Sequence, residues 1–177
     1  MLFPIIPTVP KSNPVFSTSY TKTLTTSQAF ASQAVVCITP VQITGFTKFR
    51  ITIQNGSDTS ATIDSLYFGQ LSGTYSFAAS PAQVTWGGGA DTSLTFTTAD
   101  ETVVSNIISF TPSGTAPFIF AFDVSSDNSI VMSLPFNGTG WAVYKKTGPD
   151  AATQSKSGYS AYGKTLTALI TKLEVAA

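Results

Sequence analysis

The sequence contains no histidine, and this absence excludes the commonest catalytic machinery. Serine and cysteine nucleophiles usually need an imidazole as general base, so Ser/His/Asp and Cys/His sites cannot be assembled from this chain alone. The single cysteine, Cys37, cannot form an internal disulfide, and its apolar neighbours predict a small buried residue. One cysteine without histidine also cannot supply the ligands of a zinc site. Paired carboxylates alone could hydrolyse a glycoside, but most of the acidic residues lie in predicted turns. We therefore expect no catalytic residue, no metal site and no cofactor.

Charged residues are also scarce, at 10% of the chain against roughly 25% in an average soluble domain. Nine Lys and Arg residues balance nine Asp and Glu residues, so no net field attracts nucleic acid or an anionic membrane. No apolar run approaches the roughly 20 residues that a membrane-spanning helix needs. The surface must consist of Ser, Thr, Gly, Asn and Gln, which is common in β-rich extracellular and virion proteins. We expect neither nucleic acid nor a membrane as partner.

The residues that are present fit one β-rich domain. A chain of 177 residues with 42% apolar content is long enough for one good-sized core. Phe49, Ile51 and Ile53 alternate with polar residues, which is the period of two of a half-buried strand. Asn55-Gly56 then predicts the turn that ends this strand.

Two apolar segments are predicted to form a hairpin in the second half of the chain. Every second residue is apolar from 118 to 124 and again from 130 to 136, with a polar turn at 125–129 between them. This pattern places Asp123 on the outer face of the hairpin.

Further strand-like runs follow, separated by turn clusters at spacings of roughly 8 to 14 residues, the rhythm of a two-sheet antiparallel sandwich or jelly roll. These runs are residues 34–38, 61–70, 82–86, 93–98, 102–110, 140–146 and 166–176. In the last run Leu166, Leu169, Ile170 and Leu173 share a helical face, so a short helix is the alternative to a strand there. We predict an all-β fold, an antiparallel β-sandwich of jelly-roll type.

Residues 1–20 carry four prolines without strand alternation, which predicts an extended N-terminal arm before a single β-sandwich domain at 21–177. On a free arm the apolar side chains would favour aggregation, so we expect them to pack against the same domain or a neighbouring subunit. A disordered tail is the alternative. The predicted assembly residues are Leu2, Phe3, Ile5, Ile6, Val9, Val15 and Phe16.

The three glycines Gly87, Gly88 and Gly89 raise the possibility of a phosphate-binding loop. Such a loop needs glycines that lead into a helix, whereas these lead into a strand-like run. Residues 87–91 are therefore predicted to be a hairpin bend whose glycines adopt positive φ.

Two other motifs are incomplete. Asp64, Ser65 and Leu66 match part of the nucleophile block of the GDSL esterases, but Ile63 stands in place of the glycine and no histidine can activate Ser65. Residues 123–129 have an oxygen-rich spacing that could hold calcium, but they lack the glycine and the closing glutamate of an EF-hand loop. We interpret both as ordinary strand and turn residues.

Aromatic residues indicate a possible ligand surface. Tyr159 and Tyr162 lie in a polar Gly/Ser loop, and Trp86 and Trp141 each stand beside a glycine at the edge of a strand-like run. Exposed aromatic faces stack on sugar rings, so Tyr159, Tyr162 and Trp141 are candidates for glycan contact. A tryptophan at a strand end is also typical of the core or its rim.

The stretch from Phe46 to Ser125 resembles the non-catalytic β-sandwich module that precedes the hydrolase domain in some SGNH (GDSL-type) esterases. The resemblance covers under half of the chain and rests on strand and turn order, including the turns at Asn55-Gly56 and Gly87-Gly88-Gly89. It implies a jelly-roll fold and an ancillary binding role, since the catalytic serine and histidine are missing from this sequence.

A small, sparsely charged β-protein with a proline-punctuated arm is also similar to decoration, fibre and minor structural proteins of tailed bacteriophages, in which the arm anchors the subunit. This resemblance implies a non-enzymatic structural protein located in the virion, a capsid decoration or fibre-like protein that assembles through its arm. Its expected partners are other virion or capsid proteins and further copies of itself, with a trimer favoured. The alternative is an extracellular carbohydrate-binding module or adhesin that binds a glycan.

Overall fold

The computed structural model describes residues 14, 16–21, 26–29, 33–39, 42–55, 61–124, 129–133, 142–162, 167–168 and 170–177. Strands fill most of these residues, and no helix occurs among them. Every pairing between two strands is antiparallel, as the pairing of β12 with both β3 and β6 illustrates. The predicted all-β, antiparallel sandwich is therefore confirmed, while the jelly-roll connection stays a prediction.

Sheet 1 has the order β1-β17-β4-β10, and β11 also pairs with β4. The C-terminal run is a strand, β17, and not the alternative helix. Its neighbours β1 and β4 come from the first third of the chain. The bounds are β1 (Ser17–Thr21), β17 (Ile170–Ala176), β4 (Lys48–Gln54), β10 (Thr102–Val104) and β11 (Ile108–Ser109).

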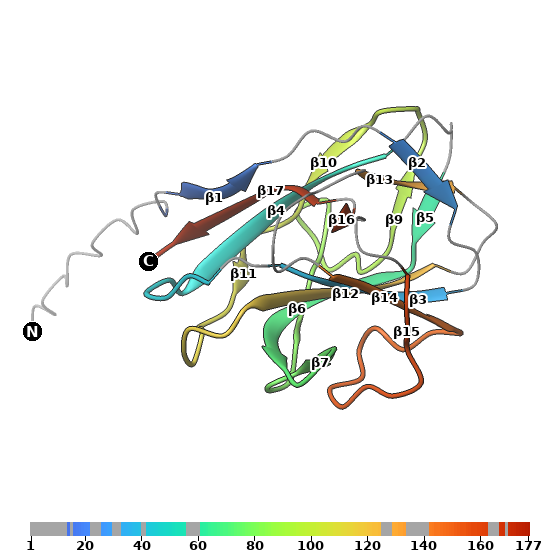
Figure 1. The fold of residues 1–177 in the computed structure, drawn as a ribbon. Coiled ribbons are helices and arrows are strands. Elements are labelled where there is room, and N and C mark those ends of the chain that lie inside the picture. The colour runs from blue at the N-terminus through green and yellow to red at the C-terminus, as the bar shows by residue number, and fades with distance from the viewer. Residues whose placement is uncertain are drawn as a thin grey trace, which may run out of the picture.

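Sheet 2 has the order β15-β14-β3-β12-β6-β7, and β8 also pairs with β6. Two smaller sheets have the orders β16-β13-β2 and β5-β9. In Figure 1, sheet 1 lies above sheet 2. The bounds in sheet 2 are β15 (Ser160–Ala161), β14 (Ala142–Thr147), β3 (Gln33–Ile38), β12 (Phe118–Val124), β6 (Ser65–Ser72), β7 (Ser76–Phe77) and β8 (Ala82–Gln83). The small sheets contain β16 (Thr167–Ala168), β13 (Ser129–Ser133), β2 (Thr26–Ala29), β5 (Ala61–Ile63) and β9 (Leu94–Phe96).

The main core lies between sheets 1 and 2 and is rich in phenylalanine. The alternation predicted in β4 is confirmed, because its apolar positions are buried and its polar positions are partly exposed. The Phe68 ring of β6 lies at the centre of the core, 4.2 Å from the Phe49 ring and 5.0 Å from those of Phe118 and Phe120, measured between centroids. Rings at these separations attract one another beyond the effect of their burial.

A second apolar cluster covers the opposite face of sheet 2. Ile119 and Ala121 of β12 lie in this cluster, whereas the phenylalanines that alternate with them lie in the main core. Both faces of β12 are therefore buried, and so is every residue of the strand. Tyr75 and Tyr159 contribute partly buried rings to the second cluster.

The predicted hairpin of residues 118–124 and 130–136 is wrong. Both edges of β12 are occupied, by β3 and β6, while β13 pairs with β2 and β16 in a separate small sheet. Asp123 is also not on a solvent-facing surface, because it is 8% exposed. The second cluster and the loop at residues 150–156 cover the face that the alternation pattern left open to water.

The glycine stretch bends the chain as predicted, but it does not connect the strands of a hairpin, and Gly89 does not adopt a positive φ. Gly87 and Gly88 have φ angles of 67° and 73°, a region that glycine adopts without the steric cost of a Cβ atom. The Trp86 amide donates to the carbonyl of Asp91 at 2.9 Å and closes the bend. The flanking strands β8 and β9 do not pair with each other, since they pair with β6 and β5.

The range of the predicted arm overlaps sheet 1. Residues 17–21 form β1, which pairs with β17 along one edge of the sheet. The sheet therefore begins at Ser17, inside the range 1–20. Of the predicted assembly residues, the structure describes Phe16; Leu2, Phe3, Ile5, Ile6, Val9 and Val15 lie outside the described residues.

Candidate functional site

Pro14 and Phe16, which precede β1 in the predicted arm, lie against the outer face of sheet 1. The guanidinium carbon of Arg50 stands 4.5 Å from the centroid of the Phe16 ring, where a cation is attracted to the ring face. With Pro14 and Ile107, these two residues line an open groove of about 470 Å³. Because Ile107 follows the edge strand β10, the groove connects the base of the arm with the opposite edge of the sheet.

A cross-strand ion pair holds Arg50 in place. The register of β4 and β17 sets Arg50 opposite Glu174, and the guanidinium Nε donates to the Glu174 Oε2 at 2.8 Å. The Lys172 ammonium lies 2.9 Å from the other carboxylate oxygen. The hydrogen bond from Arg50 keeps the pKa of Glu174 below its usual value, against the smaller effect of burial. The guanidinium is therefore fixed above the Phe16 ring.

Two large apolar side chains are exposed on the same face. Val104 is 48% exposed and Ile107 is 49% exposed. Val104 stands opposite Thr52, which shares the outward face of β4 with Arg50 because side chains alternate along a strand. Neighbouring exposed apolar side chains are typical of interaction surfaces. We name this set the arm-base surface; it consists of Pro14, Phe16, Arg50, Val104 and Ile107.

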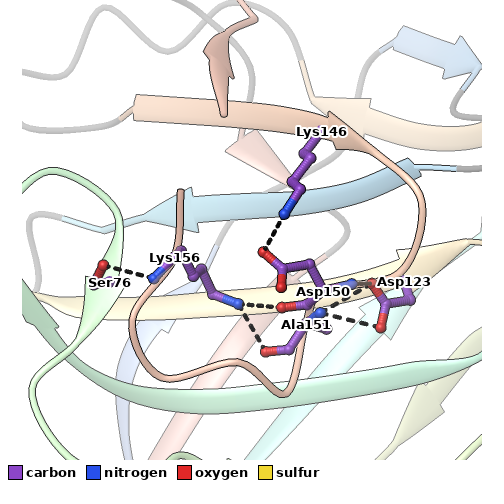
Figure 2. A network of polar contacts seen from close by, with 6 residues as sticks. All are labelled: Ser76, Asp123, Lys146, Asp150, Ala151 and Lys156. Carbon is purple, nitrogen blue, oxygen red and sulfur yellow. Dashed lines mark hydrogen bonds and ion pairs between the residues drawn. The ribbon is translucent and has the colours of Figure 1, made fainter. Parts of the chain in front are cut away.

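A buried polar network joins sheet 2 to the loop at residues 150–156 (Figure 2). The Asp123 carboxylate accepts hydrogen bonds from the backbone N–H groups of Asp150, at 2.8 Å, and Ala151, at 3.0 Å. The Ser65 hydroxyl of β6 donates to it at 3.0 Å. Buried polar groups are normally hydrogen-bonded, and these three donors explain how a carboxylate is accommodated in a fully buried strand.

Lys156 fills the centre of the same loop (Figure 2). Its ammonium donates to the carbonyl oxygens of Asp150 and Ala151, the second at 3.0 Å, and lies 5.1 Å from the centroid of the Phe77 ring. Burial lowers the pKa of Lys156 to about 8, although the carboxylates of Asp150 and Asp123 act in the opposite direction. The ammonium thus takes the place that a small bound cation would have in an oxygen-lined loop.

Asp150 links the loop to β14. Its carboxylate lies 3.3 Å from the Lys146 ammonium. Burial alone would raise the pKa of Asp150, but hydrogen bonds from Thr153 and Lys146 and the charge of Lys156 lower it overall. The loop is therefore held at both ends, by Lys146 at Asp150 and by the Ser76 hydroxyl, which accepts the backbone N–H of Lys156 at 3.0 Å.

The network gives both incomplete motifs a structural role. Ser65 donates to Asp123, and Asp123 in turn fixes the 150–156 loop, so both side chains hold parts of the fold together. The remainder of the oxygen-rich motif, at 125–128, lies outside the described residues. Across the described ranges, no group of three or more Cys, Asp or Glu side chains could hold a metal ion.

The two tyrosines of the predicted glycan surface flank β15 at the edge of sheet 2. They pack on opposite faces of this sheet. Tyr159 packs in the second cluster, with its ring centroid 5.3 Å from that of Tyr75. Burial raises the pKa of the Tyr159 phenol above its usual range, and the Asp150 carboxylate raises it further. Tyr162 packs against the main core, and the Lys145 ammonium stands 4.4 Å from its ring centroid. Part of each ring is therefore already in contact with another side chain, Tyr75 for Tyr159 and Lys145 for Tyr162.

The two tryptophans are less informative about a ligand. Trp86 is 2% exposed and belongs to the main core, which confirms its interpretation as a core residue. Trp141 lies outside the described residues, so its contact with a glycan stays a prediction.

Sequence reasoning missed the 150–156 loop. Lysine is almost never fully buried unless it is paired, so no pattern singles out Lys156 as a buried residue. The only available signal is the turn-forming run Gly148, Pro149 and Asp150, which predicts a bend but not the ammonium that fills it.

A scan against protein-family models and a search of curated proteins found no match to this chain. None of the described residues belongs to a helix of the length and apolar character needed to cross a bilayer. The fold defines an antiparallel β-sandwich protein.

Proposed function

We propose that the protein is a non-enzymatic structural protein of a virion, a capsid decoration or fibre-like subunit that assembles through its N-terminal arm. The observation that carries this proposal is the arm-base surface. There the arm meets sheet 1 at an open groove beside the exposed side chains of Val104 and Ile107. A neighbouring subunit that covers this surface removes both side chains from water.

Burial of apolar side chains can supply the free energy of assembly. Full burial of one large apolar side chain contributes about 1.5–3 kcal/mol. Association costs about 4–15 kcal/mol in lost translational and rotational freedom. The seven apolar arm residues, together with Val104 and Ile107, are enough to offset this cost if most become buried.

The edge of sheet 1 offers a second means of contact. Among the described residues, β1 pairs with β17 on one side and with no strand on the other. An open strand edge can accept a strand from another chain through backbone hydrogen bonds. Assembly through the arm therefore combines apolar burial with a site for sheet extension.

A non-catalytic role agrees with the chemistry of the chain. The sequence has no histidine, and Ser65 is bonded to a carboxylate that already fixes a loop. Assembly requires only surfaces, and the arm-base surface is the one where large apolar side chains are exposed among the described residues.

Deleting residues 2–13 is expected to convert a trimer or larger assembly into a monomer. This deletion keeps Pro14, Phe16 and β1, so the contact with Arg50 and the edge of sheet 1 remain. The measurement is the solution mass by light scattering at several protein concentrations. Thermal unfolding of both forms serves as the control that the sandwich is intact. A full-length monomer, or a truncated protein of unchanged mass, would contradict assembly through the arm.

Ile107→Asp is expected to weaken the same assembly at least about tenfold, because burial of one large apolar side chain is lost and a carboxylate must be desolvated. Stability of the subunit should change little, since Ile107 is 49% exposed. Ala78→Asp, an exposed site near β7, is the matched control and should leave the assembly constant unchanged. Equal effects of the two substitutions would exclude the arm-base surface from the interface.

A further inference from the structure

A polar pocket of about 200 Å³ lies at the edge of sheet 2, where β3, β14 and β15 meet. The register of β14 with its two neighbours places Thr147 opposite Gln33 of β3 and Lys145 opposite Ser160 of β15. Liquid water takes about 30 Å³ per molecule, so the pocket has room for roughly seven waters or one ring-sized solute. The lining residues are Gln33, Lys145, Lys146, Thr147, Gly158 and Ser160.

The charges at this pocket favour an anion. The Lys145 ammonium is held 4.4 Å from the centroid of the Tyr162 ring. The Lys146 ammonium is 5.8 Å from the Tyr159 ring centroid and 3.3 Å from the Asp150 carboxylate. Neighbouring side chains of a strand point to opposite faces, so Lys146 pairs with Asp150 on the second-cluster face, and Lys145 leaves one positive charge at the pocket. The Lys145 ammonium is positioned by its contact with the Tyr162 ring, so little conformational entropy is lost when it binds a ligand.

The hydrogen-bonding groups at the pocket favour a ligand that also carries hydroxyls. The side-chain carbonyl oxygen of Gln33 is buried and has no hydrogen-bond partner among the described residues. Such an oxygen needs a donor, and the broad terminal torsion of glutamine allows it to turn toward the pocket. The Thr147 and Ser160 hydroxyls can each donate and accept. A simple anion satisfies Lys145 but supplies no donor for Gln33.

We propose that this pocket binds an acidic sugar residue, a pyranose ring that carries a carboxylate. The carboxylate pairs with the ammonium group of Lys145, and ring hydroxyls bond to Gln33, Thr147 and Ser160. A neutral sugar leaves the positive charge unpaired. The ring of Tyr162 acts indirectly in this site, because it holds Lys145 instead of stacking on the sugar. The inference goes beyond assembly and does not depend on the arm.

Calorimetric titration of the full chain tests the proposal with three probes: methyl glucuronide, methyl glucoside and inorganic phosphate. Methyl glucuronide is expected to bind at least about tenfold more tightly than either of the others. The glucoside lacks the charge-assisted hydrogen bonds of a carboxylate, and phosphate lacks the neutral hydrogen bonds of the ring hydroxyls. Phosphate binding equal to that of the glucuronide would overturn the sugar assignment and leave a general anion site. No saturable binding of the glucuronide would overturn the proposal altogether.

Variants then locate the site. Lys145→Gln and Gln33→Leu are each expected to weaken glucuronide binding about tenfold, through loss of a charge-assisted contact and of an acceptor. Lys48→Gln, on sheet 1, is the matched control and should leave binding unchanged. Thermal unfolding checks that each variant is folded. If Gln33→Leu does not fold, Lys145→Gln still tests the site, because Lys145 is partly exposed. Binding that survives Lys145→Gln undiminished would place the sugar elsewhere and refute the assignment.

Discussion

Replacing Asp123 with alanine is expected to lower the free energy of unfolding by about 3–5 kcal/mol, the usual cost of removing one partner from a buried charged network. The substitution leaves three donors without an acceptor: the Ser65 hydroxyl and the backbone N–H groups of Asp150 and Ala151. Each buried donor left unsatisfied costs about 1–3 kcal/mol. The loss also removes a negative charge that stabilises the buried ammonium of Lys156.

Urea unfolding followed by tryptophan fluorescence measures this effect. Asp123→Asn retains one acceptor oxygen and is expected to lose about half as much stability, because a neutral acceptor forms weaker hydrogen bonds than a carboxylate. Asp91→Ala, at an exposed bend, is the matched control and should fall within about 1 kcal/mol of the natural protein. A cost below about 1 kcal/mol for Asp123→Ala would mean that solvent reaches the network and replaces the carboxylate.

Replacing Lys156 with methionine is expected to cost about 2–4 kcal/mol at pH 7, although methionine matches the length of the lysine stem. The carbonyl oxygens of Asp150 and Ala151 lose their donor, and the carboxylates of Asp150 and Asp123 lose a neighbouring positive charge. Lys172→Met removes a surface ion pair instead, and it should cost less than about 1 kcal/mol.

The stability difference between the natural protein and Lys156→Met is expected to change with pH in one direction. The pKa of Lys156 is about 8 in the folded protein against an ordinary value of 10.5. Between these values the unfolded chain holds a proton that the folded chain has released, so the contribution of this group to stability rises with pH. Below pH 8 the full cost of burying the charge is present. The difference between the natural protein and Lys156→Met should therefore be larger at pH 10 than at pH 7; a smaller difference at pH 10 would contradict the depressed pKa.

Local sequence patterns predict where strands form, but they do not predict which strands pair with one another. The alternation of Phe49, Ile51 and Ile53 depends on one strand and one buried face, so the sequence alone predicts it. The partner of β12 depends on which segments compete for its edges, and these edges go to β3 and β6 rather than to the strand that follows in sequence. Alternation also cannot distinguish a face open to water from one covered by a second cluster, so it predicts an outward-facing Asp123 where the structure has a buried one.

The candidate sites were predictable only in part. Proline spacing and apolar content indicate an arm, but the exposure of Val104 and Ile107 depends on the ends of β10 and β11, which no local pattern reveals. The tyrosines Tyr159 and Tyr162 predict a ligand surface in this region, whereas the pocket there is lined by lysines and by Gln33. Gln33 comes from a strand more than a hundred residues earlier, so only the fold brings it to the site.

The position of β17 between β1 and β4 has a kinetic consequence. The hydrogen bond between Arg50 and Glu174 joins residues 124 apart, and the one between Ser17 and Val175 joins residues 158 apart. Closing loops of this length loses chain entropy before the new contacts compensate for it, so topologies with such distant pairs fold on the slow, millisecond-to-second side of the range. We therefore expect sheet 1 to close late in folding, and the arm-base surface is complete only once that sheet has closed.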